Sequence, residues 1–271
     1  MKLSNLSFSN LVAVIGDQGT GKTRLLGTLA QLVPTVIVTA DTEGLISLRN
    51  QGIPEANLEI IQLDDWRNIW SIYNDLERYC KQGIKAITID DLGKVQGVTT
   101  EKVSYQPRGQ REERMNPEQR REEISRSLML GERRFLQQQW GEAYIALDNF
   151  LKAFRTLPCD FKWLTVLQEL QDDPRTGEPI LMPDLAGSLR AELLSYYSMV
   201  VTTFKAFDDK GVPLYCASTR DHPRVPTKDR YSIPRTWIDP TAAKLLRHLA
   251  GKDDQGSDTE TPQERSIGVG I

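Results

Sequence analysis

The chain has 271 residues, of which 39% are hydrophobic and 26% are charged, and its formal net charge is -3. This length suits one large domain with a buried core, or at most two small ones. The slightly acidic balance argues against a protein that coats nucleic acid by bulk electrostatics, so any such contact must come from a local patch. No apolar run approaches the roughly 20 residues that a membrane-spanning helix needs, and we expect no membrane partner.

The cysteines and histidines form no recognisable framework. Cys80, Cys159 and Cys216 are odd in number and widely spaced, which favours reduced thiols over disulfides. The two histidines lie far apart and lack paired cysteines, so the sequence has no zinc signature. Residues 1–10 lack the basic-then-apolar order of a signal peptide, and we expect the protein to remain in the cytoplasm where it is made.

Apolar runs with many β-branched residues alternate with helix-like segments through most of the chain. This alternation is typical of an α/β fold in which a mainly parallel sheet is flanked by helices. The last two runs surround a turn at 208–211 and predict antiparallel strands on the C-terminal side. The expected strands are 11–15, 35–40, 58–63, 86–89, 161–167, 199–204 and 214–218.

Apolar side chains recur at helical spacing between these strands, which predicts amphipathic helices. We expect one folded domain over 1–250, followed by a polar, aperiodic stretch at 251–271 that predicts a disordered tail. Residues 93–139 are richer in charge than any segment before them, and we interpret them as an insertion. The expected helices are 22–32, 66–81, 140–157 and 241–249.

Residues 16–23 follow the first strand and match G-x-x-x-x-G-K-[ST], the phosphate-binding P-loop, at every fixed position. Glycines let the backbone curl until its N–H groups face phosphate oxygens, and the helix start adds its positive dipole. Lys22 would reach the β- and γ-phosphates, and Thr23 would supply a hydroxyl to Mg²⁺. The alternative is a Gly-rich turn that matches by chance. The predicted ATP-binding residues are Gly16, Asp17, Gln18, Gly19, Thr20, Gly21, Lys22 and Thr23.

A buried-type strand at 86–89 ends in Asp90 and Asp91, which is the form of a Walker B motif. We expect this strand to lie beside the P-loop strand and to end at the same edge of the sheet. Asp90 would then hold the Mg²⁺, through a water. The alternative interpretation of Asp90 is a helix-cap or turn aspartate.

The second strand closes with Asp41, Thr42, Glu43 and Gly44, again at the expected edge. Glu43 would orient the attacking water there, and such a base contributes roughly 10² to 10⁴ in rate. Two alternatives stay open: a plain surface turn, or Asp41 rather than Glu43 facing the nucleotide. With Glu43 in this role the chain is predicted to be a Mg²⁺-dependent ATPase.

The order of these motifs, with a later strand ending in Gln168, resembles the RecA-like P-loop NTPase core. Within that class the chain looks most like compact phage proteins grouped with Sak-type single-strand annealing recombinases. The similarity covers about 6–231 and includes Trp140-Gly141, the loop 183–187 and the segment 228–231. It implies ATP hydrolysis coupled to single-stranded DNA in recombination, annealing or repair, in the bacterial host cytoplasm if a phage encodes the protein.

The same resemblance implies roles for individual residues. Glu43 matches the water-activating glutamate, and Gln168 matches a polar residue that senses the γ-phosphate; a plain polar strand end is the alternative. Lys228 and Arg230 resemble a K-x-R pair that reaches a neighbouring subunit's nucleotide, which implies a homo-oligomer with contacts in trans. Because residues two apart on a strand share a face, both cations could touch one triphosphate. The alternative is a solvated charged loop.

By the same resemblance, two loops at 93–134 and 169–190 would face DNA. The first combines Tyr105 with many cations, as single-strand binders do. Interleaved glutamates favour a solvated helix with i,i+4 pairs equally well. Residues 102–111 are the better candidate, whereas the second loop is basic only at Arg175 and Arg190. The cations of the first loop are Lys94, Lys102, Arg108, Arg111, Arg114, Arg120 and Arg121.

Two other functions remain open at the level of sequence. A P-loop kinase of a small molecule could use the arginine-rich interval as a lid, although Glu43 disfavours a site that must exclude water. A nucleotide-switched assembly or packaging factor would bind ATP with little turnover. A GTPase is disfavoured because no guanine-reading N-K-x-D or T-K-x-D motif follows the P-loop.

Overall fold

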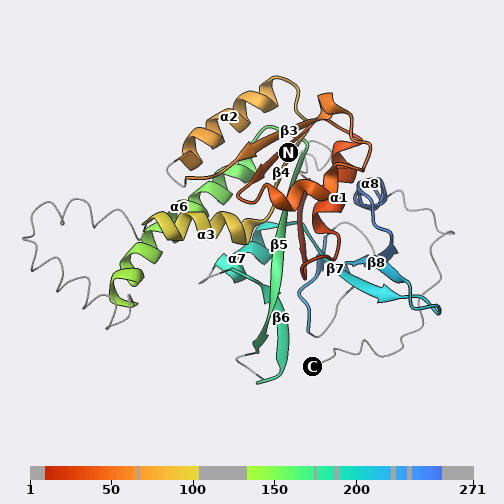
Figure 1. Ribbon diagram of the computed structural model, residues 1–271. Coiled ribbons are helices and arrows are strands. Elements are labelled where there is room, and N and C mark those ends of the chain that lie inside the picture. The colour runs from red at the N-terminus through yellow and green to blue at the C-terminus, as the bar shows by residue number, and fades with distance from the viewer. Residues whose placement is uncertain are drawn as a thin grey trace, which may run out of the picture.

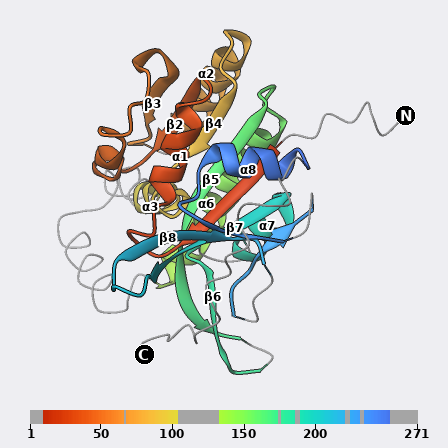
Figure 2. The same cartoon turned by 90° about the vertical axis from the view of Figure 1, so that its right-hand side faces the viewer.

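A twisted sheet runs through the molecule, and helices cover both of its faces (Figures 1 and 2). The expected α/β fold, with a mainly parallel sheet and antiparallel strands on the C-terminal side, is confirmed. The computed structural model describes residues 10–65, 68–103, 133–173, 176–185, 189–220, 224–230 and 234–251.

The strands of the main sheet join in the order β3-β2-β4-β5-β1-β7-β8-β10. Neighbours from β3 to β7 run parallel, whereas β8 is antiparallel to both β7 and β10. The strands are β1 Asn10–Gly16, β2 Thr35–Thr39, β3 Leu58–Gln62, β4 Ala86–Ile89, β5 Phe161–Asp172, β6 Pro179–Pro183, β7 Met199–Phe207, β8 Pro213–Ser218, β9 Lys228–Asp229 and β10 Thr236–Ile238.

Alternate residues of the central strands face opposite sides, so the sheet separates two cores. Leu11, Ala13 and Ile15 of β1 pack on one face with α2, α3, α6 and α7. Val12 and Val14 pack on the other face with α1 and α8. The helices are α1 Lys22–Ala30, η2 Glu43–Leu48, η3 Glu55–Asn57, α2 Ile69–Lys81, α3 Leu92–Val103, α6 Arg133–Thr156, α7 Leu189–Tyr196 and α8 Ala242–Leu249.

The strand that precedes Asp90 does not lie beside the P-loop strand, so that expectation is wrong. β5 lies between them and pairs in parallel with β1 on one side and β4 on the other. Residues 162–166 of β5 are buried, as suits a strand with neighbours on both sides and helices on both faces. Because all three strands are parallel, β1 and β4 still end at the same edge.

Parts of the two segments expected as DNA-facing loops have regular structure where the structure describes them. α3 occupies the start of the first, and β5 continues past Gln168 to pair with β6 in the second. The resulting β5–β6 arm projects away from the main sheet (Figure 1). Residues 168–172 are mostly polar because the arm leaves the core, and this polarity made them resemble a loop.

Arg190 of α7 ties the arm back to the body of the protein. Its Nε donates to the carbonyl oxygen of Pro183 at 2.9 Å. Its two terminal nitrogens donate to the side chains of Gln171 and Glu169 on the opposite strand of the arm. One guanidinium therefore holds both strands of the arm, since a planar fork of donors can serve several acceptors at once.

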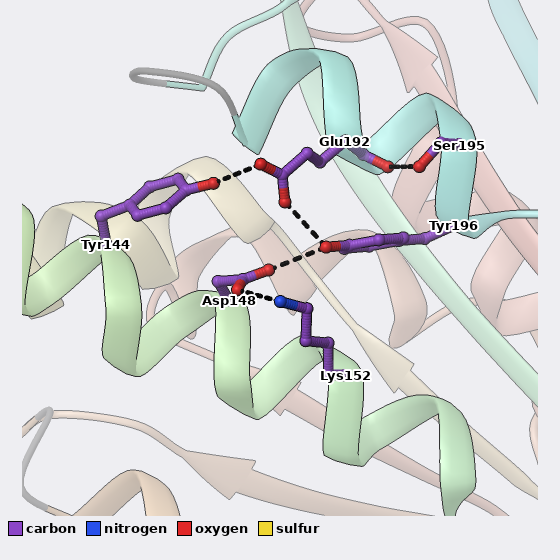
Figure 3. Close-up of polar contacts among 6 residues, drawn as sticks. All are labelled: Tyr144, Asp148, Lys152, Glu192, Ser195 and Tyr196. Atoms are coloured by element: carbon purple, nitrogen blue, oxygen red, sulfur yellow. Dashed lines mark hydrogen bonds and ion pairs between the residues drawn. The ribbon is translucent and has the colours of Figure 1, made fainter.

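A polar cluster joins α6 to α7 (Figure 3). The hydroxyls of Tyr144 and Tyr196 each donate to the Glu192 carboxylate at 2.7 Å. The Tyr196 oxygen also lies 2.9 Å from Asp148 Oδ1, while Asp148 Oδ2 accepts from Lys152 Nζ at 2.6 Å. Burial, followed by the hydrogen bonds to Glu192 and Asp148, raises the pKa of Tyr196 above its ordinary value.

Several expectations fall on residues outside the described ranges. These are the disordered tail over 252–271, the candidate DNA-contacting residues within 104–132, Arg175 and part of the loop 183–187. Trp140 and Gly141 lie within α6, which begins seven residues earlier than expected. Among the helices that the structure describes, none is both long and apolar enough to cross a membrane.

Candidate functional site

The P-loop follows β1 and leads directly into α1, which is the structural context that the motif requires. Gly19 and Gly21 have φ values of 74° and 92°, in the left-handed region that favours glycine. Gly21 is also the N-cap of α1, whose first turn contains no acidic residue. The loop therefore places backbone N–H groups and the positive end of a helix around one position, an arrangement suited to an anion.

Strand β7 holds the loop from the side. Gly16 lies opposite Thr203 in the parallel pairing of β1 with β7. Thr203 Oγ1 lies 2.8 Å from Thr20 Oγ1 in the loop and donates to the carbonyl oxygen of Ile15 at 3.2 Å. A methyl group built on Gly16 would lie 2.2 Å from Thr203 Oγ1. Only glycine fits here, because a strand approaches the backbone at that point.

Lys22 points into the loop that precedes it. Its ammonium donates to the carbonyl oxygens of Gly16 at 2.8 Å and Asp17 at 2.9 Å. Burial lowers the pKa of Lys22, and the negative charges of Asp91, Asp90 and Asp17 oppose that effect. The side chain is thus a buried cation at the position where the motif places phosphate oxygens.

Asp90 lies between two threonine hydroxyls. Thr23 Oγ1 of α1 donates to Asp90 Oδ2 at 2.8 Å, and Thr165 of β5 donates to Oδ1. Burial raises the pKa of Asp90, while the hydrogen bonds from Thr165 and Thr23 and the charge of Lys22 lower it. A hydroxyl and a carboxylate are hard oxygen ligands, so Thr23 and Asp90 fit a Mg²⁺ ion chemically.

The aspartate that follows Asp90 has a different environment. Asp91 Oδ1 accepts from the backbone N–H of Gly93 at 2.6 Å, just inside the first turn of α3. Asp91 Oδ2 is buried and has no hydrogen-bond partner among the residues that the structure describes. Burial raises the pKa of Asp91 to about 6. Asp91 therefore caps α3, whereas Asp90 accepts a hydrogen bond from Thr23 of the P-loop helix.

Glu43 begins η2, four positions after β2 ends at Thr39, and its side chain is exposed. Asp41 stabilises the turn after β2, because its Oδ1 accepts hydrogen bonds from the backbone N–H groups of Glu43 at 3.1 Å and Gly44 at 3.3 Å. Its charge also contributes to the raised pKa of Asp90, after burial. Of the two carboxylates considered for the base, Asp41 shapes the turn and Glu43 extends from it.

Gln168 lies one residue past the point where β5 pairs with the P-loop strand. Leu167 is opposite Gly16, and Gln168 is opposite Pro183 of β6. The strand expected to end at Gln168 continues to Asp172. Gln168 Oε1 is buried and lacks a hydrogen-bond partner within the described part of the chain. The amide thus sits at the junction between the main sheet and the arm.

Lys228 and Arg230 are not brought to the P-loop of their own chain. Lys228 pairs with Val200 near the start of β7, before the strand reaches the P-loop at Thr203. Its ammonium donates to the carbonyl oxygens of Leu194 at 2.8 Å and Ser195 at 3.3 Å, in the last turn of α7. Burial, with the nearby positive charges of Arg230 and Arg155, lowers the pKa of Lys228. Arg230 is exposed.

Thr165 and Thr203 were not among the predicted site residues. Thr165 is separated from Asp90 by 75 positions, and Thr203 is separated from Thr20 by 183. Nothing local distinguishes them from other polar residues of the same strands, such as Lys162 and Thr202. The register that brings them to Asp90 and to the loop is a property of the folded sheet.

No protein-family model matches the chain, and no curated protein matches it. Among solved structures the chain is similar to the crystal structure of the RadB recombinase, over 85% of this chain and 87% of that one. The sequence identity is 14% and the TM-score is 0.40. A likeness at this level assigns no activity, so a function for this chain must rest on its own residues.

Proposed function

We propose that this chain is a Mg²⁺-dependent ATPase whose site lies at the carboxyl edge of β1 and β4. The observation that carries the proposal is the 2.8 Å hydrogen bond from Thr23 Oγ1 to Asp90 Oδ2, which joins a complete P-loop to a buried carboxylate. Mg²⁺ at this pair would neutralise charge on the phosphate oxygens. Thr165 supports the site by holding the other oxygen of Asp90.

The residues of the P-loop would bind the triphosphate. Its backbone N–H groups and the N-terminus of α1 receive phosphate oxygens. Lys22 exchanges its contacts with the carbonyl oxygens of Gly16 and Asp17 for the β- and γ-phosphates. Gln168, next to Leu167 and Gly16 in the sheet, would report on the γ-phosphate.

Glu43 is the proposed general base. It extends from the end of β2, at the same edge as Asp90, and Asp41 holds the turn beneath it. The Glu43→Gln variant tests this role because it removes the base and keeps the shape of the side chain. We expect retained nucleotide binding with hydrolysis slowed roughly 10²-fold or more. Full hydrolysis by this variant would exclude Glu43 as the base.

We further propose single-stranded DNA as the partner and phage-type recombination, annealing or repair as the process. The support is the resemblance of the motif order to Sak-type annealing proteins, together with the cations within 102–111. Lys228 and Arg230 would act in trans within a homo-oligomer in the cytoplasm. The exposure of Arg230 fits a contact with a neighbouring subunit.

ATP hydrolysis measured with and without single-stranded DNA, at two salt concentrations, tests the DNA proposal. We expect stimulation by DNA that weakens at higher salt, because phosphate contacts release counterions. The Lys22→Ala variant serves as the control for contaminating ATPase. Phosphate transfer to a metabolite would instead identify a kinase, and negligible turnover with nucleotide-dependent assembly would identify an assembly or packaging switch.

A further inference from the structure

A lysine outside the P-loop motif lies directly over the loop. Lys205 belongs to β7, and a methyl group built on Gly19 would lie 3.4 Å from its ammonium nitrogen. Thr203, two residues earlier on the same strand, contacts Thr20 of the loop. Because residues two apart on a strand share a face, Thr203 and Lys205 both point towards the P-loop.

Lys205 can reach the P-loop because β1 ends before β7 does. β1 pairs with β7 as far as Gly16 opposite Thr203, and β7 then continues to Phe207 without β1 beside it. The loop occupies the space next to this free length of strand. Lys205 therefore extends over the loop, and its side chain is exposed to solvent.

Tyr215 positions the lysine from the neighbouring strand. It lies directly opposite Lys205 in the β7–β8 hairpin. The Lys205 ammonium lies 5.8 Å from the centroid of the Tyr215 ring, and the guanidinium of Arg24 lies 5.4 Å from it. A methyl group on Gly21 would lie 3.3 Å from the same ring. One aromatic ring thus holds two cations against the P-loop.

The charge of Lys205 is available to a ligand. Neither a hydrogen bond nor an ion pair of its ammonium is found with the described residues, whereas Lys22 is committed to two carbonyl oxygens of the loop. An ammonium on a flexible stem suits phosphate as a point charge, and phosphate is the anion that the loop N–H groups receive. We propose that Lys205 is a second phosphate-binding cation, which contacts the polyphosphate of a nucleotide held by the P-loop of the same chain.

This inference rests on the proposed nucleotide site, and the test separates the two. MgATP is titrated into the wild type and into the variants Lys205→Met, Lys205→Arg and Lys22→Ala. Methionine keeps the stem over Tyr215 and removes the charge. A matched control is Lys210→Met, which removes the same charge from the turn of the same hairpin, outside the P-loop.

We expect Lys205→Met to weaken MgATP binding about five- to thirtyfold, the effect of one partly exposed charge-assisted hydrogen bond. Lys205→Arg should weaken MgATP binding less than Lys205→Met does, since arginine keeps the charge. Lys210→Met should bind as the wild type does, and thermal unfolding without nucleotide should be unchanged in both methionine variants.

Equal binding by Lys205→Met and the wild type, while Lys22→Ala loses binding, would overturn the role of Lys205 and leave the nucleotide site standing. An equal loss in Lys205→Met and Lys210→Met would also overturn it, because the effect would then be general electrostatics. If the wild type does not bind MgATP at all, the proposed nucleotide site itself fails.

Discussion

At the scale of single residues, two hydroxyls determine how a buried carboxylate is held at the candidate site. Asp90 is 5% exposed, and each of its oxygens accepts from a threonine on a different element. A carboxylate in an apolar interior is costly unless it is hydrogen-bonded. Thr23 and Thr165 therefore fix the orientation of Asp90 before any ligand binds.

Replacing Thr165 with valine should show how much the hydrogen bond from Thr165 to Asp90 contributes to stability. The variant leaves Asp90 Oδ1 without its donor, and we expect the free energy of unfolding to fall by about 1–3 kcal/mol. Urea titration without nucleotide measures the change. Thr88→Val is the matched control, because Thr88 is also buried but its hydroxyl makes only a 3.5 Å contact with the Val36 carbonyl. Equal stability of the two variants would contradict the role of Thr165.

The loop residues themselves could be predicted because the motif is continuous in the sequence. Thr23 and Lys22 follow from residues 16–23 alone, and Asp90 follows from the apolar run before it. Thr165 and Lys205 could not be predicted, since each reaches the candidate site through the pairing of strands that are distant in sequence. The pattern within one strand indicates which face a residue takes but not which distant strand lies beside it.

At the scale of elements, the end of β1 is packed tightly against β7. An alanine methyl at Gly16 would lie 2.2 Å from Thr203 Oγ1 and 2.5 Å from the Thr203 carbonyl oxygen. The strand backbone cannot give way as a flexible side chain could. We therefore expect Gly16→Ala to force β1 and β7 apart at the P-loop.

The expected result of Gly16→Ala is a loss of about 1–3 kcal/mol in unfolding free energy, together with weaker MgATP binding. Gly97→Ala is the control, because no described atom beyond its chain neighbours and the nearby backbone of its own helix lies within 4 Å of a methyl group at that position. It should stabilise the protein by about 0.5–1 kcal/mol through helix propensity. A Gly16→Ala variant as stable as the wild type would show that the strands separate freely.

The stability that Tyr196 contributes, through its contacts between α6 and α7, should decrease at alkaline pH. Its pKa is raised in the folded protein, so the native state keeps the phenol proton where the unfolded chain releases it. The stabilising contribution of Tyr196 is complete below about pH 10 and declines as pH rises above the ordinary pKa of tyrosine.

Tyr196→Phe tests this contribution. At pH 8 we expect a loss of about 1 kcal/mol in unfolding free energy from the missing hydrogen bonds to Asp148 and Glu192. The difference from the wild type should narrow above pH 10, as measured by urea unfolding at several pH values. Tyr73→Phe, in α2, is the control. A difference that stays constant with pH would contradict the proposed cause.

Strands with buried faces were predicted closely, and segments outside the core were not. The expected strand at 86–89 coincides with β4, because four apolar or β-branched residues are buried in succession. The β5–β6 arm was missed since its polar residues satisfy their backbone groups by pairing with a segment seven or more positions away. Such pairing leaves no hydrophobic periodicity to detect.

At the scale of the whole molecule, Lys228 and Arg230, the K-x-R pair, bear on whether subunits assemble with contacts in trans. Lys228 holds the last turn of α7 through two carbonyl oxygens, whereas Arg230 is exposed. If Arg230 completes the nucleotide site of a neighbouring subunit, an Arg230→Ala subunit should regain ATP hydrolysis when its neighbour is a Lys22→Ala subunit, because that neighbour still carries Arg230.

Mixing Arg230→Ala with Lys22→Ala subunits tests this arrangement. Each variant alone should hydrolyse ATP slowly, and the mixture should be faster than either, because Lys22→Ala subunits still supply Arg230 to their neighbours. Steady-state phosphate release after subunit exchange measures the effect. An Arg230→Ala variant with wild-type hydrolysis, or a mixture no faster than its parts, would remove the trans contact.

The length of β5 has a mechanical consequence. One uninterrupted strand runs from Phe161, between β1 and β4, to Asp172 at the far part of the arm. No loop separates these two ends, and the strand leaves the main sheet after Leu167. We expect a displacement of the sheet edge beside Gly16 to be transmitted along β5 towards the arm, against the restraint that Arg190 places on both of its strands.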